Sequence, residues 1–270
     1  MQAPVSPGVR PPRPLVFGHR GGRALAPENT IAAFDRGLEA GADGLELDVR
    51  LSRDGVPVVH HDPDLDRCTS AAGPLDALTA ADLAQIDAAH RFDPDNGHPW
   101  RGRGVSIPTL AEVLGRYPEA SVIVEVKTYT AEAARAVVRC VLEADAAGRV
   151  CIGGFDLATL RAVRALAPGV ATGAAQPEVR WAMYGARIGL RPFWHEYRAL
   201  QVPEAVGATR IVTRRFVERL HAADVPLQVW TVNEEADMVR LLDWGVDGLI
   251  TDRPDLAAAV RDRWLRQRHP

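Results

Sequence analysis

Short runs of β-branched and aliphatic residues alternate with longer amphipathic stretches along almost the whole chain. The amphipathic stretches, such as AAFDRGLEA and LATLRAVRALA, have the spacing of helices that bury one face. Regular alternation of this kind is typical of βα units, whose strands lie parallel in one sheet. Eight runs are predicted as strands: Leu15 to His19, Gly44 to Leu51, Ser121 to Lys127, Val150 to Gly154, Val170 to Ala175, Ala199 to Val202, Leu227 to Val232 and Gly248 to Thr251.

Eight βα units in a chain of 270 residues favour a closed sheet over an open one. A (β/α)8 TIM barrel takes about 250 residues. No GxGxxG follows the first predicted strand, which removes the main sign of dinucleotide binding in the open, doubly wound fold. We therefore expect an α/β protein with one TIM-barrel domain over residues 14–270, preceded by a flexible, proline-rich tail over residues 1–13.

Composition excludes several other classes of protein. Hydrophobic residues make up 47% and charged residues 25% of the chain, which is ordinary for a globular protein and unlike a disordered one. A net charge of −3 gives no general attraction to nucleic acid, and no apolar run approaches the roughly 20 residues that span a bilayer. The three cysteines form no CxxC pair, and the N-terminus lacks the apolar core of a secretory signal. We expect a cytoplasmic monomer or homodimer with no stable membrane insertion.

Two segments break the alternation. Asp54-Gly55 separates the β-rich runs ELDVRLSR and VPVVHH, and an Asp-Gly pair in this setting predicts a two-residue hairpin turn. Residues 62–108, which follow the second strand of that hairpin, are rich in Asp, Gly and Pro. They are too many for a simple loop, so we expect a small inserted subdomain with a helix near residues 80–87.

Glu46 and Asp48 form an acidic pair inside the second predicted strand. Side chains two residues apart in a strand project from one face, so both carboxylates are expected to point away from Leu45, Leu47 and Val49. Two adjacent carboxylates inside a barrel repel each other and lose hydration. A divalent cation that prefers oxygen ligands, such as Mg2+ or Ca2+, relieves both costs. An acidic, solvated hairpin is the alternative.

The predicted hairpin adds a histidine to this pair. If Asp54 and Gly55 are the central residues of the turn, His61 falls directly opposite Asp48, within about 5.5 Å between Cβ atoms. His60 then points to the other face. An imidazole beside a metal-binding carboxylate is suited to act as a general acid or base, whereas a histidine taken alone is more often structural.

Further polar residues end the first and third predicted strands, and the chemistry of a TIM barrel takes place at such ends. His19 and Arg20 lie in GHRGG, whose glycines allow a ligand to approach the backbone. Arg20 also carries a planar fork suited to phosphate oxygens. Glu125 and Lys127 repeat the i, i+2 spacing, so they can supply a third metal oxygen and a positive charge for an anionic substrate. A structural ion pair between these two residues is the alternative.

Aromatic residues mark two further places in the sequence. Trp230, in LQVWTVN, lies near a strand end and is either a pocket wall or part of the core. The stretch from Trp181 to Tyr197, with Tyr184, Phe193 and Trp194, follows the fifth predicted strand and forms either a lid or a packing surface. Two aspartates in the last motif, GVDGLITDRP, are expected to be structural and to cap loops: Asp247 and Asp252.

Several of these motifs occur in an order that resembles the glycerophosphodiester phosphodiesterase family. The resemblance runs from near residue 16 to near residue 256, and the number of motifs makes it more specific than HRG alone. The shared motifs are GHRGG at Gly18 to Gly22, APENTIAAF at Ala26 to Phe34, GADGLELDVRLSRDGVPVVHHDPDLDR at Gly41 to Arg67, IPTLAEVL at Ile107 to Leu114, VEVK at Val124 to Lys127, VWTVN at Val229 to Asn233 and GVDGLITDRP at Gly245 to Pro254.

The resemblance implies a TIM barrel with a small insertion and one bound divalent cation, Mg2+ or Ca2+, with Mn2+ as a further option. It implies the following site residues: Glu46, Asp48 and Glu125 on the metal, His19 and His61 as acid and base, Arg20 and Lys127 on the phosphate, Trp230 against the glycerol, and Glu28 in contact with the substrate or behind its contacts. Gly154-Phe155 stands where the family often has Ser-Phe, and the aromatic stretch is not shared, so the preferred alcohol stays open.

The expected activity is hydrolysis of small-molecule glycerophosphodiesters to sn-glycerol 3-phosphate and an alcohol, with two histidines as acid and base. The nucleophile is either water or the glycerol 2-hydroxyl, and the sequence does not say which histidine is the acid. One alternative is a lysophospholipase D on the same barrel, for which the aromatic stretch near Trp194 offers apolar surface. Another is a catalytically silent barrel that only captures a phosphorylated ligand, but neither histidine and none of the carboxylates is missing.

Overall fold

A computed structural model describes residues 6–187 and 196–268 of the chain. Its centre is a sheet of eight parallel strands, which occur in the order β6-β5-β4-β2-β1-β11-β10-β7. The bounds of the strands are β1 Leu15–Gly18, β2 Gly44–Leu51, β4 Ser121–Val126, β5 Val150–Gly153, β6 Ala171–Thr172, β7 Leu200–Pro203, β10 Leu227–Trp230 and β11 Gly248–Thr251. All eight predicted strands are present, and β2 and β11 have the predicted bounds.

The two ends of this strand order also meet. A parallel bridge joins Gly173 to Ala199, next to β6 and β7. Two backbone hydrogen bonds accompany it, from Ala174 to Ala199 at 3.0 Å and from Arg198 to Thr172 at 2.7 Å. The α/β fold is therefore confirmed, and the arrangement of its strands is consistent with a TIM barrel.

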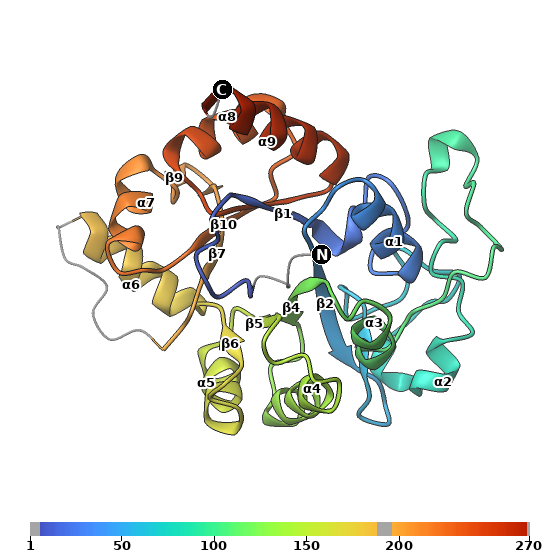
Figure 1. Cartoon of the computed structure of the whole chain (residues 1–270). Helices are drawn as coiled ribbons and strands as arrows, with labels where there is room; N and C mark the ends of the chain where they lie inside the picture. The colour runs from blue at the N-terminus through green and yellow to red at the C-terminus, as the bar shows by residue number, and fades with distance from the viewer. Residues whose placement is uncertain (1–5, 188–195, 269–270) are drawn as a thin grey trace.

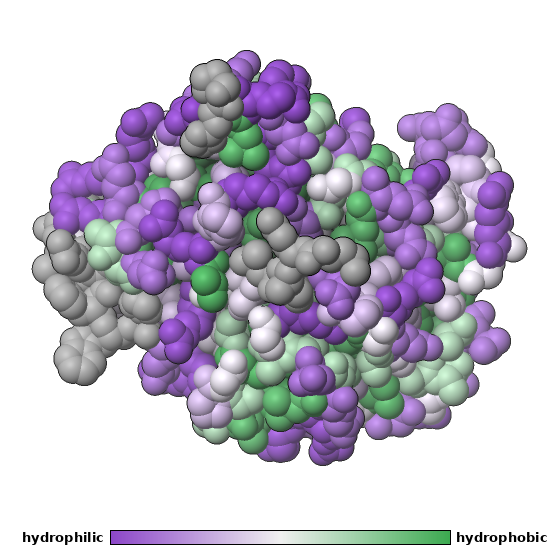
Figure 2. Space-filling model, viewed as in Figure 1, coloured by the Kyte–Doolittle hydropathy of each residue, from purple (hydrophilic) through white to green (hydrophobic). Residues whose placement is uncertain are grey.

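Helices cover the outside of the sheet, each following a strand (Figure 1). Threonine or aspartate caps several of them, and the Thr30 hydroxyl, which caps α1, accepts a hydrogen bond from Ala33 N at 3.2 Å. The helices are α1 Ile31–Glu39, α3 Leu110–Arg116, α4 Ala131–Glu143, α5 Leu157–Leu166, α6 Gln176–Arg187, α7 Arg214–His221, α8 Glu235–Trp244 and α9 Pro254–Arg268. On the face shown in Figure 2, hydrophilic residues predominate and hydrophobic ones gather only in small groups.

Apolar side chains fill part of the space that the strands enclose, below the residues that end the strands. Phe17, Ile123 and Ile250 form a buried cluster there. Gly44, at the start of β2, leaves room for this cluster, because a Cβ atom there would lie 2.8 Å from the Phe17 ring and 2.5 Å from the Ser121 carbonyl oxygen. The open end of the sheet is therefore the end at which the strands finish.

The N-terminal tail contacts the opposite end of the sheet over its described part. Pro7 O accepts a hydrogen bond from Gln228 Nε2 at 2.8 Å, and Arg13 pairs with Asp43 at 2.6 Å. Residues 1–5 of the predicted flexible tail lie outside the described residues.

The hairpin after β2 differs from the prediction by one residue. β3 (Pro57–Val59) pairs with β2 so that Val49 faces Val59 and Leu51 faces Pro57. The loop therefore has three residues, 53–55, and not two. Gly55 takes its last position with a φ of 75°, the left-handed conformation that three-residue hairpin loops place there.

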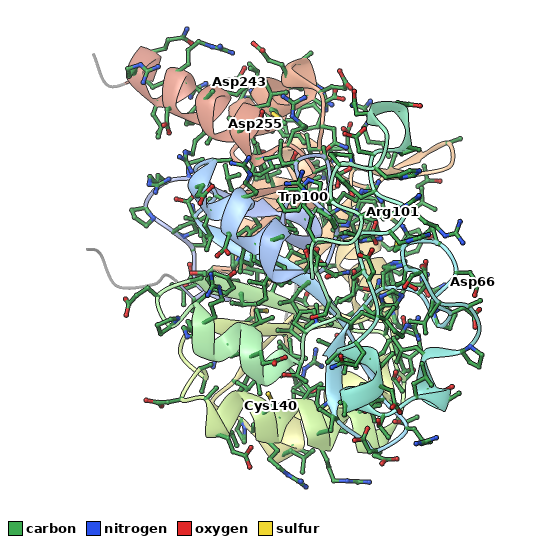
Figure 3. All side chains as sticks on the ribbon, turned by 90° about the vertical axis from the view of Figure 1, so that its right-hand side faces the viewer. Asp66, Trp100, Arg101, Cys140, Asp243 and Asp255 are labelled. Atoms are coloured by element: carbon green, nitrogen blue, oxygen red, sulfur yellow. The ribbon has the colours of Figure 1, made fainter. Side chains whose placement is uncertain are left out.

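The segment from residue 62 to residue 108 contains little regular structure. It holds one-turn elements, η2 Leu75–Ala77, α2 Ala80–Leu83 and η3 Pro94–Asn96, so the predicted helix near residues 80–87 is present but shorter. Leu65, Leu75 and Leu83 pack in a small apolar cluster with Val58 of β3. Figure 3, which faces this side of the molecule, shows Asp66, Trp100 and Arg101 on its loops.

We expect Gly44→Ala to destabilise the protein, because the added methyl group meets backbone on one side and the Phe17 ring on the other. Overpacking of this kind costs about 1–3 kcal/mol. Gly115→Ala is the matched control, since a Cβ atom on this exposed residue of α3 meets nothing within 4 Å, and it should stabilise by about 0.5–1 kcal/mol. Equal unfolding midpoints in urea for the two variants would contradict the packing described here.

Candidate active site

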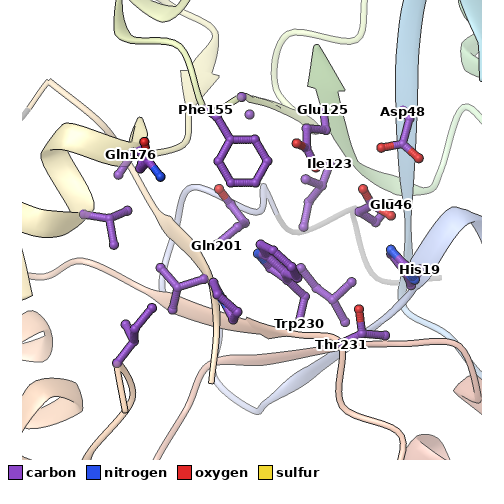
Figure 4. Close-up of a pocket in the computed structure, with 18 of the residues that line it drawn as sticks. His19, Glu46, Asp48, Ile123, Glu125, Phe155, Gln176, Gln201, Trp230 and Thr231 are labelled. Atoms are coloured by element: carbon purple, nitrogen blue, oxygen red, sulfur yellow. The ribbon is translucent and has the colours of Figure 1, made fainter. Parts of the chain in front are cut away.

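A cavity of about 580 Å3 opens where the parallel strands end. Eight of the nine residues predicted for the site line it: His19, Arg20, Glu46, Asp48, His61, Glu125, Lys127 and Trp230. Glu28, the ninth, lies behind the cavity and contacts Arg20. Figure 4 shows Glu46, Asp48, Glu125 and His19 together at one side of the cavity.

The three predicted metal ligands converge on one point. Glu46 and Asp48 project from β2, and the register of β2 with β4 places Glu125 beside Asp48. Each of the three offers a carboxylate oxygen, and these oxygens all lie within 4.8 Å of one another. Glu46 and Asp48 are buried, with 5% and 1% of their surface exposed. A solvated acidic hairpin, the alternative at the level of sequence, does not match this burial.

The three carboxylates differ in how well their charges are compensated. Burial and the neighbouring charge of Asp48 raise the pKa of Glu46 to about 7. Burial and Asp48 also raise the pKa of Glu125, although Lys127 opposes the shift. Asp48 behaves in the opposite way: burial is outweighed by Lys127 and Arg20, so its pKa is lowered. The cluster thus has negative charge in excess of its partners, which suits a divalent cation.

Two basic residues bring positive charge to this cluster. Lys127 Nζ lies 2.8 Å from Glu125 Oε1 and 3.2 Å from Asp48 Oδ1. Arg20 Nε lies 3.3 Å from Asp48 Oδ2, and its backbone N–H donates to Glu46 Oε2 at 2.9 Å. The backbone of Arg20 is left-handed, with a φ of 51°, which turns that N–H toward the carboxylate.

Two polar atoms of the site lack a hydrogen bond. Among the residues described, only three buried side-chain nitrogen or oxygen atoms have none, and Arg20 Nε and Glu125 Oε1 are two of them. Each of the two nevertheless has an ion-pair contact, Arg20 Nε with Asp48 Oδ2 at 3.3 Å and Glu125 Oε1 with Lys127 Nζ at 2.8 Å. Arg20 Nε is a donor suited to a phosphate oxygen, and Glu125 Oε1 is an acceptor suited to a cation. The residues of the site therefore fit a bound phosphate and a bound metal.

Glu28 holds the Arg20 guanidinium in place. Glu28 Oε1 accepts from Arg20 Nη1 at 2.7 Å, and Arg67 donates to both oxygens of the same carboxylate at 2.7 and 2.8 Å. Although burial opposes it, these two arginines keep the pKa of Glu28 far below its ordinary value. Arg67 belongs to the segment after β3, which is how that segment contacts the site.

His19 is paired with Asp252, which the sequence analysis treated as a loop cap. His19 Nδ1 lies 2.6 Å from Asp252 Oδ1, and Asn233 Nδ2 donates to Asp252 Oδ2 at 2.9 Å. Burial lowers the pKa of His19, but the hydrogen bond to Asp252 and the charge of Glu46 outweigh it, so the pKa is raised. Asp247, in contrast, is structural as expected and accepts from Leu227 N at 2.9 Å.

His61 reaches the cavity by a different route from the one predicted. In the observed register His60 N donates to Asp48 O at 3.0 Å, so His60 and not His61 is opposite Asp48. The chain leaves β3 after Val59, and this change of direction turns His61 into the cavity. His60 is buried on the other side, with Nε2 3.3 Å from Asp64 O.

The environment of His61 also differs from that of His19. Its Nδ1 lies 2.6 Å from Asp62 Oδ1, but burial and the positive charges of Arg20 and Lys127 prevail, and the pKa of His61 is lowered. The two histidines of the cavity are therefore shifted in opposite directions.

Aromatic residues form the middle of the cavity. Trp230 meets Phe155 edge to face, with ring centroids 6.2 Å apart, and Figure 4 shows both rings beside Gln201. Phe155 is the residue of Gly154-Phe155 that matches the Ser-Phe often found in the family, and it is not among the predicted site residues. In the aromatic stretch from Trp181 to Tyr197, which is predicted to form either a lid or a packing surface, Trp181 and Tyr184 are exposed on α6, and Tyr197 is buried. Its other two aromatic residues, Phe193 and Trp194, lie outside the described residues.

Asn29, which is not among the predicted site residues, orients Asp48, one of the predicted metal ligands. Asn29 Nδ2 donates to Asp48 Oδ2 at 2.9 Å, and Asn29 Oδ1 accepts from Asp48 N at 3.2 Å. The position of Asn29 in PENT, directly after the first loop of the site, was the available signal.

A cavity with clustered carboxylates and two histidines, at the ends of parallel strands, defines an α/β enzyme with a candidate metal site. The model of the glycerophosphoryl diester phosphodiesterase family matches residues 19–256. The chain belongs to this family and is a phosphoric diester hydrolase.

Relatives and solved structures agree with that assignment. The chain is 33% identical to a glycerophosphodiester phosphodiesterase of Caldanaerobacter subterraneus subsp. tengcongensis, over 89% of this chain and 95% of the relative. It is similar to an Oleispira antarctica phosphodiesterase solved with the product sn-glycerol-3-phosphate, with a TM-score of 0.74, 26% identity and coverage of 93% and 97%. The fold also matches a glycerophosphoryl diester phosphodiesterase domain from Mycobacterium tuberculosis, with a TM-score of 0.80, 22% identity and coverage of 92% and 99%.

In the described ranges, residues 6–187 and 196–268, no helix is both long and apolar enough to cross a bilayer.

We expect Asp252→Asn to lower the pKa of His19, because burial stays and the negative partner is lost. In the wild type, the stability that this pair contributes is full below pH 6.5 and is lost as the pH rises through the raised pKa of His19. An NMR titration of the His19 ring measures the shift directly. The control is Asp255→Asn, which removes a carboxylate paired with Arg253; an equal shift in both variants would exclude a specific pair.

Proposed function

We propose that this enzyme hydrolyses glycerophosphodiesters to sn-glycerol 3-phosphate and an alcohol, with the help of one divalent cation and two histidines. The observation that carries the proposal is the convergence of three carboxylates, two basic residues and two histidines on one cavity. The product bound to the Oleispira antarctica phosphodiesterase is consistent with it. We also propose that the sheet is a closed (β/α)8 barrel in which residues 62–108 are an insertion.

Glu46, Asp48 and Glu125 would hold the cation. Oxygen ligands favour Mg2+ or Ca2+, and Mn2+ is also acceptable to such a site. When bound, the cation would draw charge from a phosphoryl oxygen and so stabilise the transition state. Asn29 keeps Asp48 in position through its two hydrogen bonds.

Arg20 and Lys127 would contact the remaining phosphate oxygens. Each forms an ion pair with a carboxylate that fixes its position, Arg20 with Glu28 and Lys127 with Glu125. A fixed positive charge stabilises developing negative charge without having to reorganise first. A phosphate oxygen would offer Arg20 Nε the hydrogen bond that its contact with Asp48, at 3.3 Å, does not form.

The histidines would divide the proton transfers between them. His19, which Asp252 keeps inclined to hold a proton, would donate one to the leaving alcohol oxygen as the P–O bond breaks. His61, whose lowered pKa favours the neutral ring, would accept the proton of the attacking oxygen. That oxygen belongs to water or to the glycerol 2-hydroxyl, and in the second case water then opens a cyclic phosphate.

The direct test is turnover of glycerophosphocholine by the purified protein, followed as glycerol 3-phosphate. Activity should vanish in EDTA and return with Mg2+, Ca2+ or Mn2+. Full activity in a chelated, metal-free preparation would exclude the cation from the mechanism.

We expect Glu46→Gln to lose metal-dependent activity and yet to be more stable than the wild type in EDTA at pH 8. The pKa of Glu46 is raised from 4.5 to about 7, so the folded metal-free protein loses stability as the pH rises through that interval. Glu46→Gln has no carboxylate at this position, so its stability does not fall over that pH interval. Mg2+ should raise the melting temperature of the wild type only. Glu39→Gln, at an exposed carboxylate of α1, is the control, and a Mg2+ response in Glu46→Gln equal to that of the wild type would contradict the assignment.

We expect His19→Ala and His61→Ala each to lower kcat on glycerophosphocholine by about 10² or more. On a nitrophenyl ester the leaving group needs little protonation, so His19→Ala should recover most of its rate there and His61→Ala should not. Cation binding, measured by calorimetry, should persist in both. If His61→Ala is the variant that recovers, the two roles are reversed.

A further inference from the structure

Arg67, in the segment that follows β3, contacts two carboxylates at once. Its Nη1 and Nη2 donate to the two oxygens of Glu28 at 2.8 and 2.7 Å. Its Nε donates to Asp62 Oδ2 at 2.5 Å. All three nitrogen atoms of the guanidinium therefore face a carboxylate oxygen, and two segments that are far apart in the sequence share one partner.

Each of these carboxylates in turn contacts a residue of the proposed mechanism. Glu28 Oε1 accepts from Arg20 Nη1 at 2.7 Å, and Asp62 Oδ1 lies 2.6 Å from His61 Nδ1. Arg20 is proposed to bind the phosphate, and His61 to accept the proton of the attacking oxygen. A continuous series of contacts therefore runs from Arg20 to His61, and Arg67 is its central member.

The shape of the guanidinium sets the distance between the two carboxylates. Among the described residues, Arg67 is the only one whose side chain contacts both Glu28 and Asp62. An arginine presents its donors in a rigid plane, whereas a lysine ammonium is a single point of charge on a flexible stem. The positions of the two carboxylates therefore depend on one another through this planar group.

The backbone that carries Arg67 is fixed at both ends of a single turn. Thr69 N and Thr69 Oγ1 donate to Leu65 O at 3.2 and 2.8 Å, which closes the turn around Arg67. Thr69 and Leu65 are fully buried, and Leu65 belongs to the apolar cluster that includes Val58 of β3. Figure 3 shows Asp66, the neighbour of Arg67, at the outer edge of this segment.

One side of Arg67 faces a small second cavity of about 160 Å3, which Arg91 also lines. The side chain of Arg67 is 45% exposed. If this side chain is shortened, a small cation from solution can therefore reach the place that the guanidinium leaves.

We propose that Arg67 is a positioning residue of the reaction, which holds the phosphate-binding Arg20 and the general base His61 in register through Glu28 and Asp62. This inference rests on the proposed function. A displacement of about 1 Å in a reacting group can cost about 10²-fold in rate, even when its cause lies outside the reacting atoms. The segment after β3 thus has a role in the chemistry, because it supplies the group that links two halves of the site.

The first test is the kinetics of Arg67→Ala and Arg67→Gln on glycerophosphocholine with cation present. We expect kcat to fall by about tenfold to 10²-fold, because His61 is less well oriented, and KM to rise, because Arg20 is less well held. Arg67→Lys keeps the charge but not the planar fork, so it should recover little of the loss. Thermal melting shows whether each variant folds.

Arg91→Gln is the matched control. Arg91 lines the same small cavity and is exposed, and among the residues described its guanidinium forms no ion pair. Its replacement should leave kcat and KM unchanged.

The second test returns the missing group to Arg67→Ala. Guanidinium chloride, at concentrations far below those that unfold the protein, should raise kcat/KM in a saturable way by about fivefold, the value of one typical net hydrogen bond. Ammonium chloride at the same concentration should not, because it lacks the fork. Neither salt should activate the wild type or Arg91→Gln.

The third test asks whether Arg67 links the two sides of the site. With Arg67 present, the effects of Glu28→Gln and Asp62→Asn on kcat/KM should depart from simple multiplication by at least about threefold, as for residues of one hydrogen-bond network. In the Arg67→Ala background the same two effects should multiply.

The outcomes separate this inference from the proposed function. No turnover by the wild type with cation present would overturn the proposed function, and this inference with it. If the wild type is active, unchanged kinetics in Arg67→Ala would overturn the inference alone. A lower kcat with unchanged KM and no response to guanidinium would also overturn it, since that pattern indicates a smaller folded fraction. Effects of Glu28→Gln and Asp62→Asn that multiply whether or not Arg67 is present would show that no link exists.

Discussion

Three carboxylates held close together, where little water can shield them, set the conditions for the rest of the site. Glu46 and Asp48 are almost fully buried, and one oxygen of each lies within 4.8 Å of one of Glu125. Repulsion between such charges is much stronger than in water. Lys127 and Arg20 offset part of it, and Arg20 must take a left-handed backbone to bring its N–H to Glu46. The backbone conformation of the first loop therefore depends on the charge of the carboxylate cluster, because Arg20 in that loop donates its N–H to Glu46.

Strand alternation organises the inside of the sheet into layers. Phe17, Ile123 and Ile250 fill one level with apolar side chains. Two residues further along the chain, at or just past the strand ends, the side chain points inward again, and three polar residues of the candidate site occupy those positions: His19, Glu125 and Asp252. The packed layer closes the space below the site, so polar groups at the next level face only the cavity and one another.

Local patterns in the sequence predicted much of this arrangement. Buried apolar runs gave the eight strands, and a period of two placed Glu46 and Asp48 on one face. The hairpin register was wrong because Arg53-Asp54-Gly55 forms a three-residue loop in which the Asp54 carboxylate accepts hydrogen bonds from the Ser52 hydroxyl and Ala80 N. His61 nevertheless lies in the cavity, owing to the turn after β3 that no local pattern indicates.

Contacts between segments that are distant in the sequence could not be predicted from local patterns. The contact of Glu28 with Arg67 depends on how residues 62–108 return to the sheet. The contact of His19 with Asp252 depends on β1 and β11 being neighbours, with Gly18 beside Thr251. Predicting the second pair required knowing that the first and last strands are neighbours, as well as the strands themselves.

That last pairing bears on when the enzyme acquires its chemistry during synthesis. His19 and Asp252 are 233 residues apart, while all three carboxylates of the cluster have been made by residue 125. A nascent chain can therefore carry every carboxylate of the cluster long before it can hold His19 in place. Only when the final strand joins the first does His19 gain its partner, so assembly of the sheet and assembly of the His19–Asp252 pair are a single event.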